Sequence, residues 1–349
     1  MTYAELQELA ALPLLTLVER AHAVHRAHWP EGKVQVCTLL SLKTGNCSED
    51  CAYCAQSARH HTGLTPDRGL MPKQQVLERA LQARADGATR FCMGAAWRGI
   101  RTNDPRFAEL LDIVRSVRAL GLEVCATLGI IGQAEADALR DAGLSAYNHN
   151  LDTSPEYYPE IVSTHRYEDR LETISHIQRA GIRLCCGGII GLGEAPEDRL
   201  RLLEVVSGLQ PQPESFPINA LITIPGTPMS RRRPDAPDAL ETVRMVALAR
   251  LALPQSHVRL SAGRERLSPE AQALCFYAGA NSLFLGERLL TARNAPPERD
   301  IALLERLGLQ AELPHEAALP PGSAPDDDNE PHPCFREGPC TASSHHHES

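Results

Sequence analysis

The sequence has no long apolar run, no strongly basic segment and no secretory pattern at its start. No stretch approaches the roughly 20 apolar residues that cross a bilayer. The first residues, MTYAELQELA, lack both the basic beginning and the apolar centre of a signal peptide. The net charge of −9 is spread along the 349 residues, and no basic stripe is present that would bind phosphate backbones. We therefore expect a cytoplasmic protein that binds neither nucleic acid nor membranes.

Cysteine, in contrast, is abundant: the chain has eleven. The count is odd and no secretory signal is present, so a disulfide framework is not expected. In a reducing compartment, clustered cysteines more often bind metal or carry out redox chemistry. Cys37, Cys186 and Cys275 each lie among apolar neighbours, and we interpret them as small buried hydrophobic side chains.

Short apolar or β-branched runs alternate with longer amphipathic segments along most of the chain. Several of the amphipathic segments end in Gly just before the next run, as helices often do. The predicted strands cover 34–42, 89–95, 122–128, 146–151, 182–190, 215–222, 257–262 and 282–286. This alternation predicts an α/β fold of the (β/α)₈ TIM-barrel type. An open doubly wound sheet is the alternative, which the near-regular spacing of the units disfavours.

The chain divides into three predicted parts. Residues 1–33 form an N-terminal helical segment, and residues 34–311 form the barrel. Residues 312–349 are rich in Pro, Asp, Ser and His without periodicity, so we expect a disordered tail. Cys334 and Cys340 in this tail could bind a metal weakly, but a solvated tail is the preferred interpretation.

The most informative segment is CSEDCAYC, which brings Cys47, Cys51 and Cys54 together after the first predicted strand. Active sites of barrels are built from the loops that follow the strands. Thiolates at this density suit Zn²⁺ or an iron–sulfur cluster. His60 or His61 could complete a Cys₃His zinc site, so a zinc-stabilised barrel without catalytic activity is one alternative. No second CxxC half follows, however, and a cluster with three cysteine ligands leaves one iron open to bind a small molecule.

The CxxxCxxC motif, with Tyr53 before its last cysteine, resembles the radical S-adenosylmethionine (SAM) superfamily. In that superfamily three cysteines hold a [4Fe–4S] cluster, and its open iron binds the amino and carboxylate groups of SAM. The resemblance implies this role for Cys47, Cys51 and Cys54, and it assigns Tyr53 to the cofactor side. The segment GGIIGLGE is similar to the superfamily's GxIxGxxE segment, which implies that Gly191 lies beside the adenosine moiety.

Three more cysteines, Cys92, Cys125 and Cys185, lie within the second, third and fifth predicted strands. Taken alone they indicate core packing more than a second metal site. The segments TRFCMGAAW, YNHNLDTSPE, PINALI and VRLSAGRE resemble the biotin synthase family in order and spacing, from about residue 5 to 310. The resemblance implies that the strand cysteines and Arg259 ligate a [2Fe–2S] cluster. The residue chemistry alone predicts an interior cation at Arg259, because a protonated guanidinium is a poor metal ligand.

Polar residues are expected at the mouth of the barrel. Asn148, Asn150 and Asp152 alternate along YNHNLD, so they share one face of the fourth strand and its exit. The resemblance assigns Asn150 and Asp152 to contacts with cofactor and substrate, and Arg170 to the cofactor carboxylate. It also implies that Asn219 binds the cyclic urea of the substrate, for which an amide offers both donor and acceptor.

The activity implied by the resemblance is sulfur insertion into dethiobiotin to form biotin. Its cofactors would be SAM, the [4Fe–4S] cluster and the [2Fe–2S] cluster, with a reductant such as a flavodoxin or ferredoxin system. No side-chain acid or base is expected to be catalytic, because the cofactors carry the difficult chemistry. A homodimer is also expected. The nearest alternative is a lipoyl- or thiazole-forming radical SAM enzyme, which the strand cysteines with Arg259 disfavour.

Overall fold

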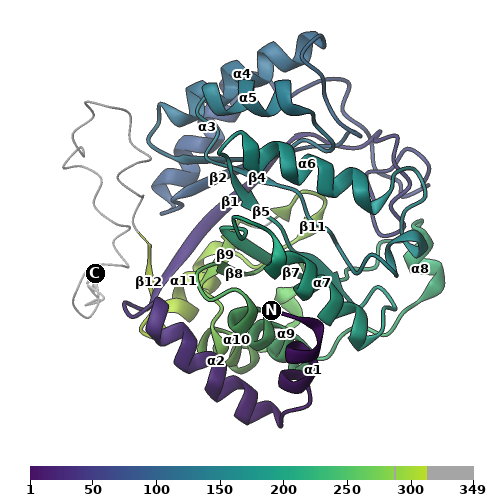
Figure 1. The fold of residues 1–349 in the computed structure, drawn as a ribbon. Coiled ribbons are helices and arrows are strands. Elements are labelled where there is room, and N and C mark those ends of the chain that lie inside the picture. Colours follow the sequence, from purple (N-terminus) through teal and green to yellow (C-terminus); the bar gives the residue numbers. More distant parts are fainter. Residues whose placement is uncertain (287, 313–349) are drawn as a thin grey trace, which may run out of the picture.

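The chain forms a closed barrel of parallel strands surrounded by helices, as the sequence predicts (Figure 1). The computed structural model describes residues 1–286 and 288–312. The predicted tail, with Cys334 and Cys340, falls on 313–349 apart from its first residue and lies outside the described residues. The barrel strands are β1 (Lys33–Lys43), β2 (Arg90–Ala95), β3 (Glu123–Thr127), β4 (Ala146–Asn148), β5 (Arg183–Cys185), β6 (Gly188–Ile190), β7 (Ser215–Ala220), β8 (His257–Leu260) and β9 (Ser282–Leu285). All neighbouring strands pair in parallel, and β1 pairs with β9 to close the barrel.

The predicted amphipathic segments all form helices on the outside of the barrel (Figure 1). These helices are α3 (Lys73–Ala85), α4 (Pro105–Arg118), α5 (Gln133–Asp141), α6 (Tyr167–Arg179), α7 (Pro196–Gly208), α9 (Ala239–Ala252) and α10 (Pro269–Ala278). Elements not predicted from the sequence are α8 (Pro228–Arg232), β10 (Arg288–Leu289), β11 (Ala292–Arg293), α11 (Pro297–Arg306) and β12 (Gln310–Ala311). Among the described residues, no helix combines the length and apolarity needed to span a bilayer.

The fifth predicted strand, 182–190, is interrupted and forms β5 and β6 instead of one strand. Both pieces pair with β7, through Cys185 with Ser215 and Gly188 with Ile218. Pro217 lies on β7 between these two positions and has no N–H to donate to the sheet. At Gly187 an added Cβ would lie 2.0 Å from the Pro217 carbonyl oxygen. The break therefore follows from a proline opposite a tightly packed glycine.

The N-terminal segment packs on the barrel helices through α1 (Tyr3–Ala10) and α2 (Leu14–His28). His22 of α2 stacks on Tyr277 of α10, with ring centroids 3.8 Å apart. The indole nitrogen of Trp29 donates to the carbonyl oxygen of Pro254 at 3.1 Å. Thus α2 packs against α9 and α10, and α1 packs against α7 and α9.

Strand residues of alternate phase build two separate cores. Val34 and Val36 of β1 face the helices and belong to one large apolar cluster. Cys37 and Leu39 have the opposite phase and belong to a second, small cluster inside the barrel. Because side chains alternate across a strand, the even and odd positions of each strand divide between these two cores. The interior core is the one that contains most of the strand thiols.

Buried charges close the barrel at the amino-terminal ends of its strands. Arg90, the first residue of β2, is fully buried and pairs with Glu123 at 2.7 Å and with Glu214 at 2.8 Å. Arg183 also pairs with Glu123, at 2.5 Å. Burial opposes ionisation of Glu214, but the Arg90 guanidinium holds its pKa below the ordinary value. Charged groups therefore plug the end of the barrel opposite the cysteine loop.

Replacing Arg90 by leucine is expected to lower the free energy of unfolding by about 3–5 kcal/mol, since the buried Glu123 and the half-buried Glu214 each lose an ion-pair partner. Urea unfolding of the purified chain measures this loss. A matched control is Arg106→Leu, which removes a partly exposed ion pair with Asp104 and should cost less than about 1 kcal/mol. Equal losses for the two variants would mean that the buried pairs do not stabilise the barrel.

Candidate functional site

The three motif cysteines lie in the long loop between β1 and α3, at the carboxyl end of the barrel. Cys51 is buried, whereas Cys47 and Cys54 are partly exposed. The Cys47 amide donates to the Gln56 carbonyl oxygen at 2.9 Å, and the Cys54 amide donates to that of Cys51 at 2.9 Å. These bonds fold the segment back on itself and bring the three thiols to one side of the barrel mouth.

The acidic residues between the first two cysteines anchor the loop. Asp50 accepts backbone hydrogen bonds from Ser163 at 3.0 Å and Thr164 at 3.2 Å. Burial opposes ionisation, but hydrogen bonds from Ser163 and Thr164 lower the pKa of Asp50 to about 2. Glu49 is buried and pairs with His165. Glu49 and Asp50 thus hold the cysteine loop against the segment that follows η1 (Tyr158–Glu160).

Burial disfavours the thiolate form of the three loop cysteines, so a nearby positive charge would be needed to keep them ionised. Burial raises the pKa of Cys54 to about 11, and it also raises the pKa of Cys47 and Cys51. Lys43 is buried nearby, and its ammonium donates to the carbonyl oxygens of Gly45 at 2.6 Å and Ala96 at 2.9 Å. Metal binding would favour the thiolate form of these cysteines.

Four of the predicted cofactor residues meet in one hydrogen-bonded network. The Tyr53 hydroxyl donates to Asp152 Oδ2 at 2.7 Å, and Arg170 Nη2 lies 3.2 Å from the same oxygen. Arg170 Nη1 also donates to the carbonyl oxygen of Asn150 at 2.6 Å. Asp152 has a left-handed backbone with φ of 67°, which few residues other than glycine adopt. The loop motif, the exit of β4 and α6 are thereby joined beside the cysteines.

The other two predicted contact residues lie on the next strands. Asn219 on β7 donates to the Gly188 carbonyl oxygen at 3.0 Å and accepts from the Ala262 amide at 3.3 Å. Its side chain therefore bridges neighbouring strands and keeps one N–H for a ligand. Gly191 follows β6 with φ of 87°, and an added Cβ would lie 2.5 Å from a Pro237 ring carbon. The close approach of Pro237 is therefore enough to require glycine at this position, whether or not a ligand lies beside it.

The strand cysteines converge inside the barrel. Cys92 and Cys125 are paired residues of β2 and β3 and pack in the same small interior cluster. Cys185 on β5 accepts a hydrogen bond at its sulfur from Asn148 Nδ2 at 3.2 Å. All three are at least 96% buried, with exposed fractions of 4%, 1% and 1%. The interior therefore holds thiols well apart from the loop that carries the first three.

Arg259 on β8 reaches this interior group. Its Nη1 lies 3.5 Å from the Cys185 sulfur, its Nη2 donates to Gln35 Oε1 at 2.7 Å, and its Nε donates to Ser282 Oγ at 2.8 Å. Burial works against the charge, but the thiols of Cys37 and Cys185 hold the pKa of Arg259 above its ordinary value. Arg259 is therefore a buried interior cation, as the residue chemistry predicts, and it lies beside the proposed cluster ligand Cys185.

The remaining cysteines divide according to strand phase. Cys186 faces the helices and packs in the large apolar core, so only Cys185 of that pair reaches the interior. Cys275 packs in the same outer core. Cys37 is buried as predicted, but it lies inside the barrel with its thiol against Cys92 and is not an ordinary core cysteine. The sequence interpretation missed this place, although Gln35 and Ser41, in phase with Cys37, are polar and signal an inward-facing row.

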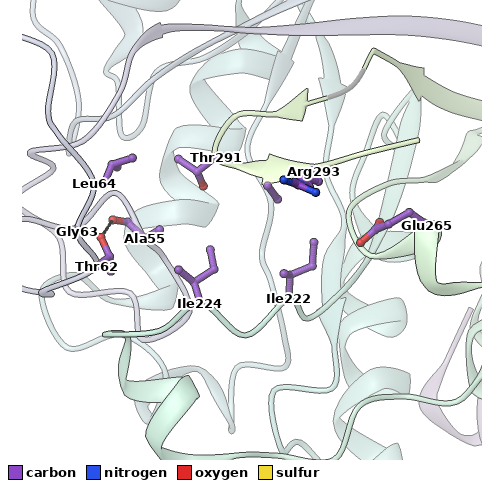
Figure 2. Close-up of a pocket in the computed structure, with 10 residues that line it drawn as sticks. Ala55, Thr62, Gly63, Leu64, Ile222, Ile224, Glu265, Thr291 and Arg293 are labelled. Carbon is purple, nitrogen blue, oxygen red and sulfur yellow. Dashed lines mark hydrogen bonds between the residues drawn. The ribbon is translucent and has the colours of Figure 1, made fainter. Parts of the chain in front are cut away.

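A pocket of about 450 Å³ opens beside the cysteine loop (Figure 2). Its lining comes from segments that follow β1, β7, β8 and β9, all at the carboxyl end of the barrel. Ile222 and Ile224 point toward the hairpin that carries Thr291 and Arg293, as Figure 2 shows. The other lining residues are Ala55, Thr62, Gly63, Leu64, Glu265 and Ala292. The pocket is thus a mainly apolar space with the Arg293 guanidinium and the Glu265 carboxylate on its walls.

The donor chemistry of both thiol groups fits iron–sulfur clusters, which are held by cysteine thiolates. Across residues 1–286 and 288–312, no three Cys, His, Asp or Glu side chains lie close enough together to hold a single metal ion. The ligands of a cluster surround several metal atoms and need not meet that condition. His60, a candidate fourth zinc ligand, has its Nε2 at 3.0 Å from the Cys51 carbonyl oxygen.

Two family patterns match consecutive parts of the chain. The radical SAM superfamily matches residues 41–206, which contain both the CxxxCxxC loop and the strand cysteines. The Biotin and Thiamin Synthesis associated domain matches residues 217–310, which contain Arg259 and the hairpin at the pocket. The two patterns together cover most of the barrel.

Curated proteins that are similar to this chain over most of its length are biotin synthases. A biotin synthase of Myxococcus xanthus is 53% identical over 313 residues, which are 90% of this chain and 89% of the relative. A biotin synthase of Methylobacterium sp. is 54% identical over 309 residues, 88% of this chain and 92% of the relative. One of Synechococcus sp. is 53% identical over 304 residues, 87% of this chain and 97% of the relative.

Solved structures share the fold. Methylornithine synthase superimposes with a TM-score of 0.74 at 18% identity, covering 89% of this chain and 94% of that one. The FeFe-hydrogenase maturase of Carboxydothermus hydrogenoformans gives 0.73 at 16% identity, covering 90% and 77%. At these identities the likenesses show a shared fold and nothing more. From the identity to curated relatives over nearly its whole length, the chain belongs to the biotin synthase family of radical SAM enzymes.

Proposed function

We propose that this chain inserts sulfur into dethiobiotin to form biotin, with one iron–sulfur cluster at the loop and a second inside the barrel. The observation that carries the proposal is the interior cluster that contains Cys92 and Cys125, together with Cys185 in contact with Arg259. A superfamily member that only generates a radical needs no such second group of thiols. When bound, the clusters and SAM supply the radical, the electron and the sulfur that side chains cannot provide.

The loop side of the site would hold SAM. Cys47, Cys51 and Cys54 are the proposed ligands of a [4Fe–4S] cluster, which leaves one iron for the amino and carboxylate groups of SAM. Tyr53 and Asp152 lie directly beside these ligands, joined at 2.7 Å. Their network would orient the cofactor, and with Arg170 and Asn150 it excludes water from the centre of the mouth.

The interior side would hold a [2Fe–2S] cluster, with Cys92, Cys125, Cys185 and Arg259 as its proposed ligands. These residues come from four strands of one rigid sheet. The barrel walls keep competing hydrogen donors away from a substrate that lies between the two thiol groups. Asn219, which keeps a donor directed from β7, is the proposed contact to the cyclic urea.

The substrate's flexible end fits the pocket beside the loop. Dethiobiotin carries an alkyl chain that ends in a carboxylate. Ile222, Ile224 and Leu64 offer apolar contact to such a chain, and Arg293 offers a charge of opposite sign at the wall. In the proposed orientation the cyclic urea would lie toward the barrel interior and the carboxylate toward β11 (Ala292–Arg293).

The test is biotin formation by anaerobically reconstituted protein given dethiobiotin, SAM and a chemical reductant. We expect biotin and 5′-deoxyadenosine, both measured by mass spectrometry. Formation of 5′-deoxyadenosine without biotin, together with turnover of a lipoyl or thiazole precursor, would assign the chain to another sulfur-inserting class. Neither product, in protein that carries zinc and no sulfide, would contradict the proposal altogether.

Asp152→Asn is expected to reduce SAM cleavage by about ten- to a hundredfold, because partners that orient a metal-bound group are worth that much. Asparagine tolerates the left-handed backbone of this position, so the change removes the charge without straining the turn. The rate of 5′-deoxyadenosine formation measures the loss. Tyr53→Phe removes one hydrogen bond of the same network and should reduce SAM cleavage less than Asp152→Asn does. A larger reduction for Tyr53→Phe would mean that Asp152 is not the residue that orients the cofactor.

Arg293→Gln is expected to raise KM for dethiobiotin by about tenfold with kcat nearly unchanged, since it removes a uniform binding contact to the substrate carboxylate. Steady-state biotin formation at several substrate concentrations measures this. Arg288→Gln, on the same hairpin but outside the pocket, is the control and should leave KM unchanged. Equal behaviour of the two variants would remove Arg293 from the substrate site.

Two further proposals rest on the family resemblance. Electrons would come from a small redox protein such as a flavodoxin or a ferredoxin. The active form would be a homodimer, which sedimentation equilibrium of the reconstituted protein tests.

A further inference from the structure

The barrel interior contains a thiol that the proposed cluster ligands do not use. Cys37 lies on β1 with an exposed fraction of 0%. Its sulfur lies 3.5 Å from Gln35 Oε1, and it shares a face of β1 with Leu39, whose Cα is paired with that of Cys92. It therefore belongs to the same small interior cluster as Cys92 and Cys125.

With Cys37 included, four strands each direct one thiol into this interior. Cys92 packs in one cluster with Cys37 and with Cys125, its paired residue on β3. Cys185 completes the group from β5, held by Asn148 at 3.2 Å. Four cysteine thiolates are the commonest complete ligand set of an iron–sulfur cluster. These four cysteines could therefore supply all four ligands of the interior cluster without Arg259.

Arg259 is well placed as the counter-charge of such a set. Its three nitrogens are each directed to a polar partner, namely Ser282, Gln35 and the Cys185 sulfur. A guanidinium that donates hydrogen bonds at every nitrogen has no lone pair for iron unless it loses a proton. The Cys37 thiol faces the same group of sulfurs and, as a thiolate, is the softer and stronger donor for iron.

We propose that Cys37 is an additional ligand of the interior cluster, able to take the fourth position when Arg259 does not occupy it. The inference rests on the proposed function, because it requires a cluster at this place. It predicts that Arg259 is dispensable for holding the cluster in this chain, and that this tolerance disappears when Cys37 is also replaced.

The experiment counts iron and sulfide in chains whose loop cysteines Cys47, Cys51 and Cys54 are all alanine, so that only the interior cluster remains. This parent is expected to hold about two irons and two sulfides after anaerobic reconstitution. Adding Arg259→Leu should leave more than about half of that content and shift the visible absorption toward an all-thiolate cluster. Leucine is tolerable here because Ser282 and Gln35 remain hydrogen-bonded to each other at 3.2 Å.

Adding Cys37→Ser to Arg259→Leu should then reduce the bound iron by about tenfold, since one thiolate ligand is lost. The matched control is Cys186→Ser with Arg259→Leu, which changes a cysteine that faces the outer core and should retain the cluster. Far-ultraviolet circular dichroism checks that each variant is folded.

Loss of the cluster in Arg259→Leu alone would overturn the inference, as would equal iron content with and without Cys37. An unchanged absorption spectrum in the folded Arg259→Leu chain would overturn it too, even if the double variant failed to fold. A parent that binds no iron or sulfide at all would instead contradict the proposed function, because the interior cluster itself would be missing.

Discussion

Replacing Cys54 by alanine is expected to lower the rate of reductive SAM cleavage by about a thousandfold or more, because residues that act as one unit fail together when one is removed. Cys54 is one of three loop thiols beside the Tyr53–Asp152 contact. Without its thiolate the cluster loses the geometry that leaves one iron open to the cofactor. The measurement is 5′-deoxyadenosine formed per chain under excess reductant, with and without dethiobiotin.

The control for Cys54 is Cys275→Ala, which removes an equally small thiol from the outer core. It should leave SAM cleavage unchanged. A Cys54 variant that cleaves SAM at the parent rate would show that the loop is not the seat of the radical chemistry.

Cys125→Ala is expected to abolish biotin formation while sparing part of the SAM cleavage. Cys125 lies in the interior, paired across β2 and β3 with Cys92, and contributes nothing to the loop. Its loss would remove a proposed ligand of the sulfur-supplying cluster and leave the radical-generating one in place. The ratio of 5′-deoxyadenosine to biotin should rise by at least about a hundredfold, a change that mass spectrometry measures directly.

Cys186→Ala is the matched control for Cys125→Ala, because Cys186 adjoins the proposed ligand Cys185 yet faces the helices. It should form biotin at nearly the parent rate. If Cys54→Ala and Cys125→Ala lost SAM cleavage and biotin formation in the same proportion, the division of labour between two clusters would be wrong.

The repeating strands and helices of the barrel could be predicted from the sequence because their signals are local. Apolar runs and terminal glycines fix where strands and helices lie, and parallel closure follows from their number. The break between β5 and β6 could not be predicted in the same way, since it arises from Pro217 on a neighbouring strand. The two-residue strands β10 and β11 carry no periodicity. For α11 a signal existed: Pro297 at its first position and an acidic first turn.

The candidate site residues could be proposed from the sequence, but their geometry could be predicted only in part. Motif spacing identified the loop cysteines, and resemblance identified the interior ones. The pairing of Glu49 with His165 joins residues 116 positions apart, so no local pattern reveals it. The inward direction of Cys37 was available from strand phase, because polar Gln35 shares its face. Arg293 reached the pocket through the hairpin that sequence periodicity did not detect.

The iron and acid-labile sulfide content of the anaerobically reconstituted chain tests the central claim most directly. Two clusters predict about six irons and six sulfides per chain, falling to about two of each when Cys47, Cys51 and Cys54 are replaced. The same chain should form biotin from dethiobiotin. Zinc without sulfide would contradict the account, and so would about four irons that vanish completely with the loop cysteines.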